Sequence, residues 1–281
     1  LICGAQVAGL VTNEREARIT LKDGRTLEGS LLIAADSRFS AARRQMGIAA
    51  HMHDFGREVI VCRMAHEAQG DGVAHECFHW GRTLAILPMN KKEVSVVMTV
   101  KTPDAQALAD LSAEALAREV EAQFGGRLGA MRLVGARHRY PLVAVYARRF
   151  VARRFALIGD AAVGMHPVTA HGYNFGLYGV ECLTRQMRDA REAGRDFAGE
   201  AVLAAYQRAH RRETFAIFAG TNALVKLFTD ERRIARVVRP RLLKLANRLP
   251  PLKAWITRHL TDVPGPRGPG RLIAQLKSLR G

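Results

Sequence analysis

The segment from Phe155 to Gly176 constrains the fold of this 281-residue chain more than any other stretch. It opens with a short apolar run, Phe155 to Ile158, which is typical of a buried strand. Gly159 and Asp160 follow at once, so a carboxylate is expected at the carboxyl end of that strand, where open α/β sheets bind ligands. The pattern therefore predicts an α/β fold with a ligand site at the edge of the sheet.

A loop and a helix follow this strand. The loop, His166 to Gly172, carries Pro and Gly, and a helix is expected from about Tyr173 and Asn174 to about Arg191. The amides and the dipole at a helix N-terminus favour negative charge. We therefore expect one site at which the Asp160 carboxylate, the loop and the start of the helix meet. Such a site suits a hydroxylated, partly anionic cofactor.

These residues resemble the flavin-contacting segment of the FAD-dependent aromatic hydroxylases, and most closely that of the ubiquinone-biosynthesis hydroxylases. The resemblance implies that Gly159 and Asp160 bind the ribityl chain of FAD. It also implies that a loop lies along the isoalloxazine ring, and the residues assigned to that contact are Pro167, Gly172, Tyr173 and Asn174, with His166 and Gly176 completing the matching motif.

The segment departs from the family pattern at three positions. Ala170 and His171 stand where Gly-Gln is usual, and Gly179 stands where an Asp often follows. His166 and His171 are expected at the substrate pocket, although hydrogen bonding to the loop backbone is the favoured role for both. No residue is assigned a catalytic role, and the departures leave the identity of the substrate open.

A second segment supports the cofactor assignment. An Asp-Gly turn at residues 23–24 is expected to join two strands, the second of which, Leu31 to Ala35, ends at Asp36. Ser40 and Arg43 then open a helix. This arrangement resembles the family's Asp-Gly-x-x-Ser-x-x-Arg fingerprint for FAD and nicotinamide binding, with Ser37 in place of the Gly. The resemblance implies that Asp36 and Arg43 bind cofactor, with Arg43 paired to a phosphate or to Asp36.

The glycine-rich turn that cradles a cofactor's pyrophosphate in this fold class is not found in the sequence. We therefore expect an N-terminally incomplete flavoprotein whose Rossmann-like FAD/NAD(P)-binding domain lacks its first βαβ unit. The expected divisions are 1–49 and 151–200 for that domain, 50–150 for an inserted antiparallel-sheet substrate domain, and 201–281 for C-terminal helices with a basic tail. The alternative is a fragment that exists as it stands and binds no FAD.

Short β-branched runs predict the antiparallel sheet of the insert. They lie at residues 57–65, 75–80, 83–89 and 93–100, a helix is expected from Ser112 to Phe124, and a last strand from Met131 to Leu142. The family has a substrate sheet in this position, lying over the flavin.

The chain has 48% hydrophobic residues and four cysteines without Cys-x-x-Cys spacing. It has no apolar run of about 18 residues, the length typical of a membrane-spanning helix. The cysteines are interpreted as reduced thiols of a cytoplasmic protein rather than as a disulfide or a zinc site. No bound metal is expected, because no carboxylate or Cys completes a ligand set around the histidine pairs.

The net charge of +17 is concentrated late in the chain. Residues 226–281 hold 14 Lys or Arg and three acidic residues, interleaved with apolar residues and Trp255. Two interpretations stay open: a basic amphipathic region that contacts the inner membrane peripherally, or helices that pack on the FAD domain with a solvated basic face. Nucleic acid is not expected as a partner, because no nucleic-acid motif accompanies the charge.

The resemblance implies an FAD-dependent monooxygenase that uses NADH or NADPH and O₂ and hydroxylates an aromatic ring by way of a flavin C4a-hydroperoxide. The expected substrate is a polyprenylated phenol, a membrane-dissolved precursor of ubiquinone. The alternatives are another flavin enzyme on the same scaffold, such as a phenol or salicylate hydroxylase, a reductase or a halogenase, and a non-catalytic fragment.

Overall fold

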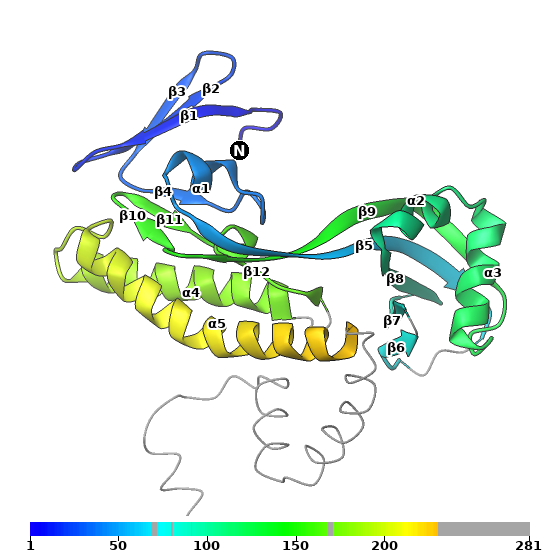
Figure 1. Ribbon diagram of the computed structural model, residues 1–281. Coiled ribbons are helices and arrows are strands. Elements are labelled where there is room, and N and C mark those ends of the chain that lie inside the picture. Colours follow the sequence, from blue (N-terminus) through cyan, green and yellow to red (C-terminus); the bar gives the residue numbers. More distant parts are fainter. Residues whose placement is uncertain (69–71, 80, 91, 168–170, 230–281) are drawn as a thin grey trace, which may run out of the picture. The chain divides into compact units, whose positions relative to one another are not determined.

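The computed structural model describes residues 1–68, 72–79, 81–90, 92–167 and 171–229 of the chain. The first four strands of the chain belong to two small three-stranded sheets (Figure 1). The first is antiparallel, with strand order β1-β2-β3 and bounds Val7–Thr12, Ala17–Leu21 and Thr26–Gly29. The second has the order β10-β11-β4, with bounds Val151–Ala152, Phe155–Leu157 and Leu32–Ala34.

The expected connection at the Asp-Gly turn was wrong. Gly24, whose φ of +87° suits a residue without a Cβ, turns β2 into β3 and not into the strand at residues 31–35. Four residues, Thr26–Gly29, pair with β2 before the chain reaches β4. The strand β4 then leaves this hairpin and pairs in parallel with β11, as an α/β fold requires.

The third sheet has six strands in the order β12-β9-β5-β8-β7-β6. Their bounds are Val163–Gly164 for β12, Met131–Ala147 for β9, Ala50–His66 for β5, Glu93–Lys101 for β8, Arg82–Pro88 for β7 and His75–His79 for β6. Each pairing in this sheet is antiparallel, which confirms the antiparallel sheet that the sequence predicts.

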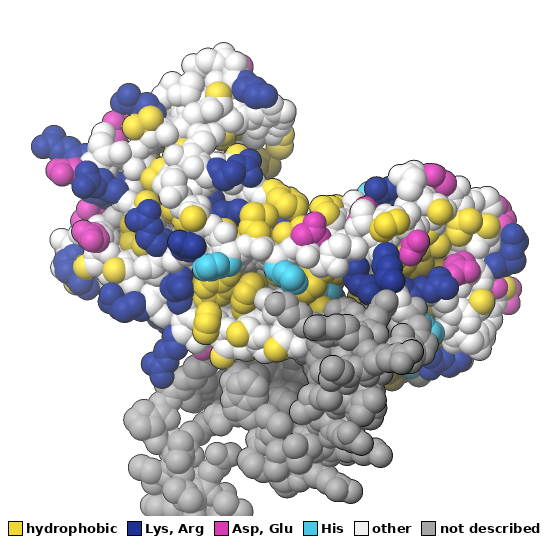
Figure 2. Space-filling view, viewed as in Figure 1, with side chains coloured by type: hydrophobic (Ala, Val, Ile, Leu, Met, Phe, Trp, Pro, Cys, Tyr) yellow, Lys and Arg dark blue, Asp and Glu magenta, His cyan; other side chains and the backbone are white. Residues whose placement is uncertain are grey.

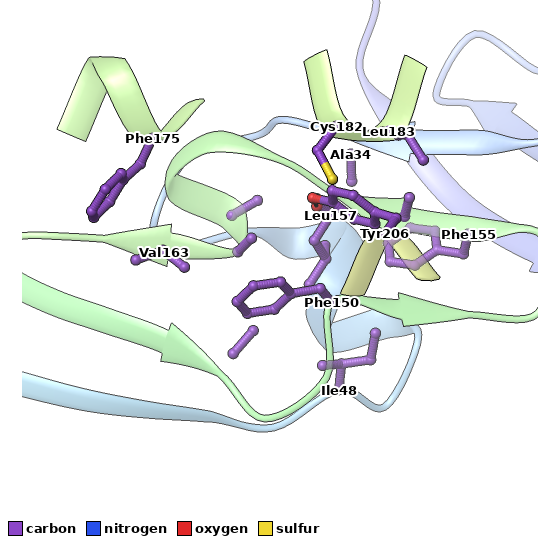
Figure 3. Close-up of a cluster of buried hydrophobic side chains, with 14 of the residues drawn as sticks. Ala34, Ile48, Phe150, Phe155, Leu157, Val163, Phe175, Cys182, Leu183 and Tyr206 are labelled. Atoms are coloured by element: carbon purple, nitrogen blue, oxygen red, sulfur yellow. Dashed lines mark hydrogen bonds between the residues drawn. The ribbon is translucent and has the colours of Figure 1, made fainter. Parts of the chain in front are cut away.

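The described residues build two hydrophobic cores. The first lies between β11, β12, α4 (His171–Glu192) and α5 (Glu200–Thr229), and Figure 3 shows its side chains packed together, among them Phe150, Phe155, Leu157 and Tyr206. The second lies between one face of the six-stranded sheet and the helices α2 (Thr102–Ala109) and α3 (Ala113–Phe124), and it includes Ile60, Met98 and Leu116.

Strand β9 contributes side chains to both cores, and its long partner β5 runs beside it (Figure 1). Residues 50–54 pair with 143–147 beside the first core, and residues 58–66 pair with 131–141 in the second. A bulge separates the two stretches of β5, and Gly56 with φ +63° lies within it. The predicted boundary at residue 50 thus coincides with the start of β5, but the paired strands continue from beside the first core into the second.

Local sequence signals account for the helix ends. The side chain of Ser112 accepts a hydrogen bond from the amide of Ala115 at the start of α3, and Gly125 ends that helix with φ +68°. The short helix α1 (Ala41–Gln45) is capped by Ser40. Helix α4 begins at His171, two residues before the expected start, and α2 was not expected at all.

No helix among the described residues is long and apolar enough to cross a membrane. The predicted basic tail lies almost entirely in residues 230–281, outside the described residues. In the view of Figure 2, hydrophobic and His side chains gather where β5 and β9 cross the middle of the molecule, and Lys and Arg side chains are frequent beside them.

Candidate cofactor site

The two segments assigned to the cofactor, residues 31–43 and 155–176, lie together because their strands are neighbours. Strands β4 and β11 run in parallel with Ala34 opposite Leu157, and the amide of Ile158 donates to the carbonyl of Ala34 at 3.0 Å. Both strands therefore end at the same edge of the sheet. Asp36 follows one strand end and Asp160 follows the other, as the sequence predicts.

Asp36 organises the start of α1. Its Oδ1 accepts the hydroxyl hydrogen of Ser40 at 2.5 Å, and its Oδ2 accepts from the amide of Ala42 at 3.0 Å. The hydroxyl of Ser40 in turn accepts from the amide of Arg43 at 2.8 Å, and Ser40 is fully buried. These bonds satisfy amides of the first helical turn, so the carboxylate stabilises the loop after β4.

Arg43 has a different set of partners from the phosphate or Asp36 pairing that the sequence favours. The side chain is 2% exposed, and its guanidinium donates to the carbonyls of Ala161 at 2.8 Å and Arg38 at 3.0 Å. Because both bonds are to backbone oxygens, Arg43 fastens the loop after β4 to the turn after β11. We therefore propose that Arg43 positions this loop; its contact with cofactor stays a prediction.

Arg38 is a site residue that the sequence reasoning missed. Its Nε and Nη2 both donate to Oδ2 of Asp160, at 3.2 and 2.7 Å, and its Nη1 donates to the carbonyl of Val143 at 3.0 Å. Charge-assisted pairs of this kind are stronger than neutral hydrogen bonds and fix orientation. Arg38 thus ties Asp160 to both the loop after β4 and strand β9.

The backbone at Ser37 is held in a conformation that usually requires glycine. Its φ is +77°, in the left-handed region where a side chain is disfavoured. This is the position at which the resembling family carries Gly. The turn is retained here with Ser, and Arg38 follows it directly into the contact with Asp160.

Asp160 retains one oxygen for a ligand. Within the described residues, both hydrogen bonds to its carboxylate fall on Oδ2, which leaves Oδ1 as an acceptor. Gly164 packs closely against both side chains: a Cβ added to it would lie 3.2 Å from Cβ of Arg38 and 3.6 Å from Cγ of Asp160. A fixed carboxylate with one open oxygen suits a hydroxylated ligand such as a ribityl chain.

Helix α4 begins beside this carboxylate. It packs against the single turn η1 (Gly159–Ala161), and a Cβ added to Gly176 would lie 3.6 Å from Cα of Gly159. Its first residues carry four of the predicted contacts. His171 and Gly172 open the helix, Tyr173 and Asn174 are exposed, and Pro167 lies exposed before it. The side chain of His171 is outside what the structure describes.

His166 follows Met165 of the first core and contacts the bulge of β5. It is 7% exposed, and its ring contacts the ring of Phe55 edge-on with centroids 5.0 Å apart. Burial, together with the nearby cations Arg57 and Arg38, lowers the pKa of His166 to about 4. The ring is therefore neutral at ordinary pH. Among the described residues, no group of three His, Cys, Asp or Glu side chains could hold a metal ion.

A sheet edge with two carboxylates and the start of a long helix defines an α/β domain of the kind that binds a dinucleotide cofactor. A family model described as FAD binding domain matches residues 4–217. The chain belongs to this family of FAD-binding domains.

Two curated relatives illustrate the similarity. The chain is 46% identical over 250 residues to a ubiquinone hydroxylase, UbiM, of Neisseria meningitidis, and the match covers 89% of the chain and 54% of that relative. It is 37% identical over 261 residues to a ubiquinone hydroxylase, UbiL, of Rhodospirillum rubrum, with 92% and 60% covered. The chain thus spans little more than half the length of the relatives it matches.

Solved structures share the fold. HpxO of Klebsiella pneumoniae, in a complex with FAD and uric acid, matches with a TM-score of 0.70 at 18% identity over 94% of this chain and 68% of that one. The anhydrotetracycline hydroxylase OxyS of Streptomyces rimosus matches with a TM-score of 0.70 at 19% identity over 95% of this chain and 54% of that one. At these identities the likeness establishes the fold.

Proposed function

We propose that the chain is the FAD-binding part of a monooxygenase that hydroxylates an aromatic quinone precursor with O₂ and NADH or NADPH. The observation that carries this proposal is the joined pair of strand ends, at which Arg38 fixes Asp160 and leaves Oδ1 open beside the start of α4. The names of the relatives supply the substrate class, a ubiquinone precursor.

Bound FAD would accept a hydride from the nicotinamide and activate O₂ for transfer of one oxygen atom to an electron-rich ring. The residues of the chain bind and orient. Asp160 accepts a hydrogen bond from a ribityl hydroxyl, and the amides of Gly172, Tyr173 and Asn174 at the start of α4 favour negative charge on the ring system. Gly159 and Pro167 line the same edge.

In this proposal Asp36 and Arg43 act on the cofactor site indirectly, by holding the loop that contains Arg38. The bonds of Asp36 within α1 and those of Arg43 to two carbonyls hold the loop in which Arg38 lies. The inserted sheet beside His166 would exclude water from the reacting ring, because a dry site protects reactive oxygen species from side reactions.

The substrate proposal has a consequence for location. A polyprenylated ring dissolves in the membrane, and residues 226–281 combine basic and apolar side chains. We propose that this segment places a cytoplasmic enzyme peripherally on the inner membrane.

Titration of FAD into the purified protein tests the cofactor site. Asp160→Ala removes the proposed acceptor, and loss of a hydrogen bond that involves a charged group costs about 1.5–3 kcal/mol, so FAD binding should weaken about tenfold or more. Flavin fluorescence measures the affinity.

Asp196→Ala is a matched control, because Asp196 is also a carboxylate paired with an arginine, Arg154, at 2.6 Å. It lies away from the strand edge, so FAD affinity should be unchanged. Equal affinities for wild type and Asp160→Ala would overturn the assignment of Asp160.

A further inference from the structure

Arg57 is a buried cation without a counter-charge in the described part of the chain. The residue is 9% exposed, and its single hydrogen bond runs from Nη1 to the carbonyl of Gly81 at 2.5 Å. No carboxylate among the described residues lies within ion-pair distance of it. A buried charge is costly unless it is paired, so an uncompensated guanidinium calls for a ligand that supplies the negative charge.

The neighbouring charged residues do not fill this role. Glu58, the next residue, points to the other face of the sheet as strand alternation requires, and it is paired with Arg139. The nearby cation Arg38 has its own partner in Asp160. The carboxylate of Asp54 accepts the amide of Gly56 at 2.8 Å within the bulge.

The position of Arg57 places it beside the candidate cofactor site. It is the last residue of the bulge in β5, and Phe55 in the same bulge contacts the ring of His166. The sheet face that Arg57 shares with Val59 is opposite to the face that packs on α2 and α3. Arg57 therefore does not point into the second core, and it lies close enough to His166 to lower the pKa of that ring.

We propose that Arg57 binds the anionic oxygen of an aromatic substrate and so favours the phenolate form of the ring. This inference rests on the proposed function and adds to it the ionisation state of the substrate. A guanidinium presents several N–H donors in a plane, and only one is used by Gly81. A phenolate is also more electron-rich than the phenol, which suits attack by the ring on an electrophilic oxygen.

The FAD-loaded protein and 4-nitrophenol test the inference, since the absorbance of this probe distinguishes its phenol from its phenolate. The wild type should bind the probe with its pKa lowered by about one unit or more, a tenfold preference for the phenolate. Arg57→Gln should abolish the shift and weaken binding of the phenolate about tenfold or more. Arg57→Lys keeps the charge and should retain part of the shift.

Arg63→Gln is the matched control, because Arg63 lies on the same strand and face but is exposed and paired with Glu93 at 3.4 Å. It makes the same change in net charge and should leave the probe unaffected. An unshifted pKa or absence of probe binding in the FAD-loaded wild type would overturn the inference, as would an equal shift in Arg57→Gln. Failure to load FAD at all would instead contradict the proposed function.

The reduction potential of bound FAD separates this assignment from a contact with the flavin. The potential should be unchanged in Arg57→Gln. A lowered potential together with an unaltered probe would assign the charge to the reduced flavin and overturn the proposal. Circular dichroism of Arg57→Gln and Arg57→Lys checks that both variants are folded.

Discussion

His210 shows how one buried side chain links several elements. The hydroxyl of Tyr206 donates to the carbonyl of Leu157 at 2.6 Å, so its oxygen accepts from Nδ1–H of His210 at 3.0 Å. Thr214 donates back to the carbonyl of His210 at 2.8 Å. The ring is 1% exposed and lies edge-on to Phe150, which places a titratable group inside the first core.

The buried ring predicts a loss of stability in acid. Burial lowers the pKa of His210 to about 4, and a backbone hydrogen bond with Phe175 offsets only part of this effect. An unfolded histidine takes up a proton near its ordinary pKa of about 6.5, so stability present above that value is lost as pH falls toward 4. The free energy of unfolding of wild type should therefore fall between neutral and acid pH. In His210→Gln this fall should be smaller by an amount on the order of 1–3 kcal/mol.

Urea unfolding at pH 7 and pH 4.5 measures the effect. His51→Gln, a change at an exposed histidine, is the control and should keep the slope of wild type. His166 contributes in the same pH range and in the same direction, so a residual slope is expected in His210→Gln. An unaltered slope in that variant would refute the argument.

At the scale of elements, α4 and α5 pack together through a glycine. A Cβ added to Gly179 of α4 would lie 2.6 Å from Cε1 of His210 on α5. The ring cannot move aside easily, because Tyr206 holds it and Phe150 packs against it. This contact gives a physical reason for Gly at position 179, where the aromatic hydroxylases that the sequence resembles often have Asp.

Gly179→Ala should therefore destabilise the protein by about 1–3 kcal/mol, the usual cost of overpacking a core. Gly220→Ala on α5 is the control: nothing lies within 4 Å of its added Cβ, and the better helix propensity of Ala should stabilise by up to about 1 kcal/mol. Thermal unfolding of both variants measures the difference. Equal midpoints would show that the two helices separate at little cost.

Local patterns predicted the elements better than the contacts between them. The strand ends at Asp36 and Asp160 followed from apolar runs next to polar residues, and the cap at Ser112 followed from its position before a helical pattern. The strand β3 was missed because its four residues carry no clear alternation and all are exposed. Helix α2 was missed because it starts directly after β8, without a loop.

The candidate site required three-dimensional information. The bond from Arg38 to Asp160 joins residues 122 positions apart, and no local signal distinguishes Arg38 from the exposed arginines nearby. The partners of Arg43 and the missing counter-charge of Arg57 are likewise properties of packing. Sequence identified the two carboxylates, and the structure identified Arg38 as the residue that holds Asp160.

At the scale of the whole molecule, the basic segment 226–281 predicts binding to anionic lipid. The protein should co-sediment with vesicles that contain phosphatidylglycerol and not with vesicles of phosphatidylcholine alone, because each basic residue near an anionic surface contributes about 1 kcal/mol. Binding should weaken with added salt. A variant that ends at residue 229 is the control, and co-sedimentation of that variant would place the contact elsewhere.

The unbroken pairing of β5 with β9, which spans both cores, has a consequence for protein engineering. Exchange of the inserted sheet between relatives, to alter which ring is accepted, should not be made at residue 50. Residues 50–54 pair with 143–147, and Tyr146 and Ala147 in that stretch belong to the first core. A chimera should be cut in both strands at the bulge, between Asp54 and Glu58 and opposite it between Pro141 and Val143. A cassette of residues 58–141 would then include both strands of the pairing between 58–66 and 131–141. Val143 would remain in the recipient protein, where its carbonyl accepts the hydrogen bond from Arg38.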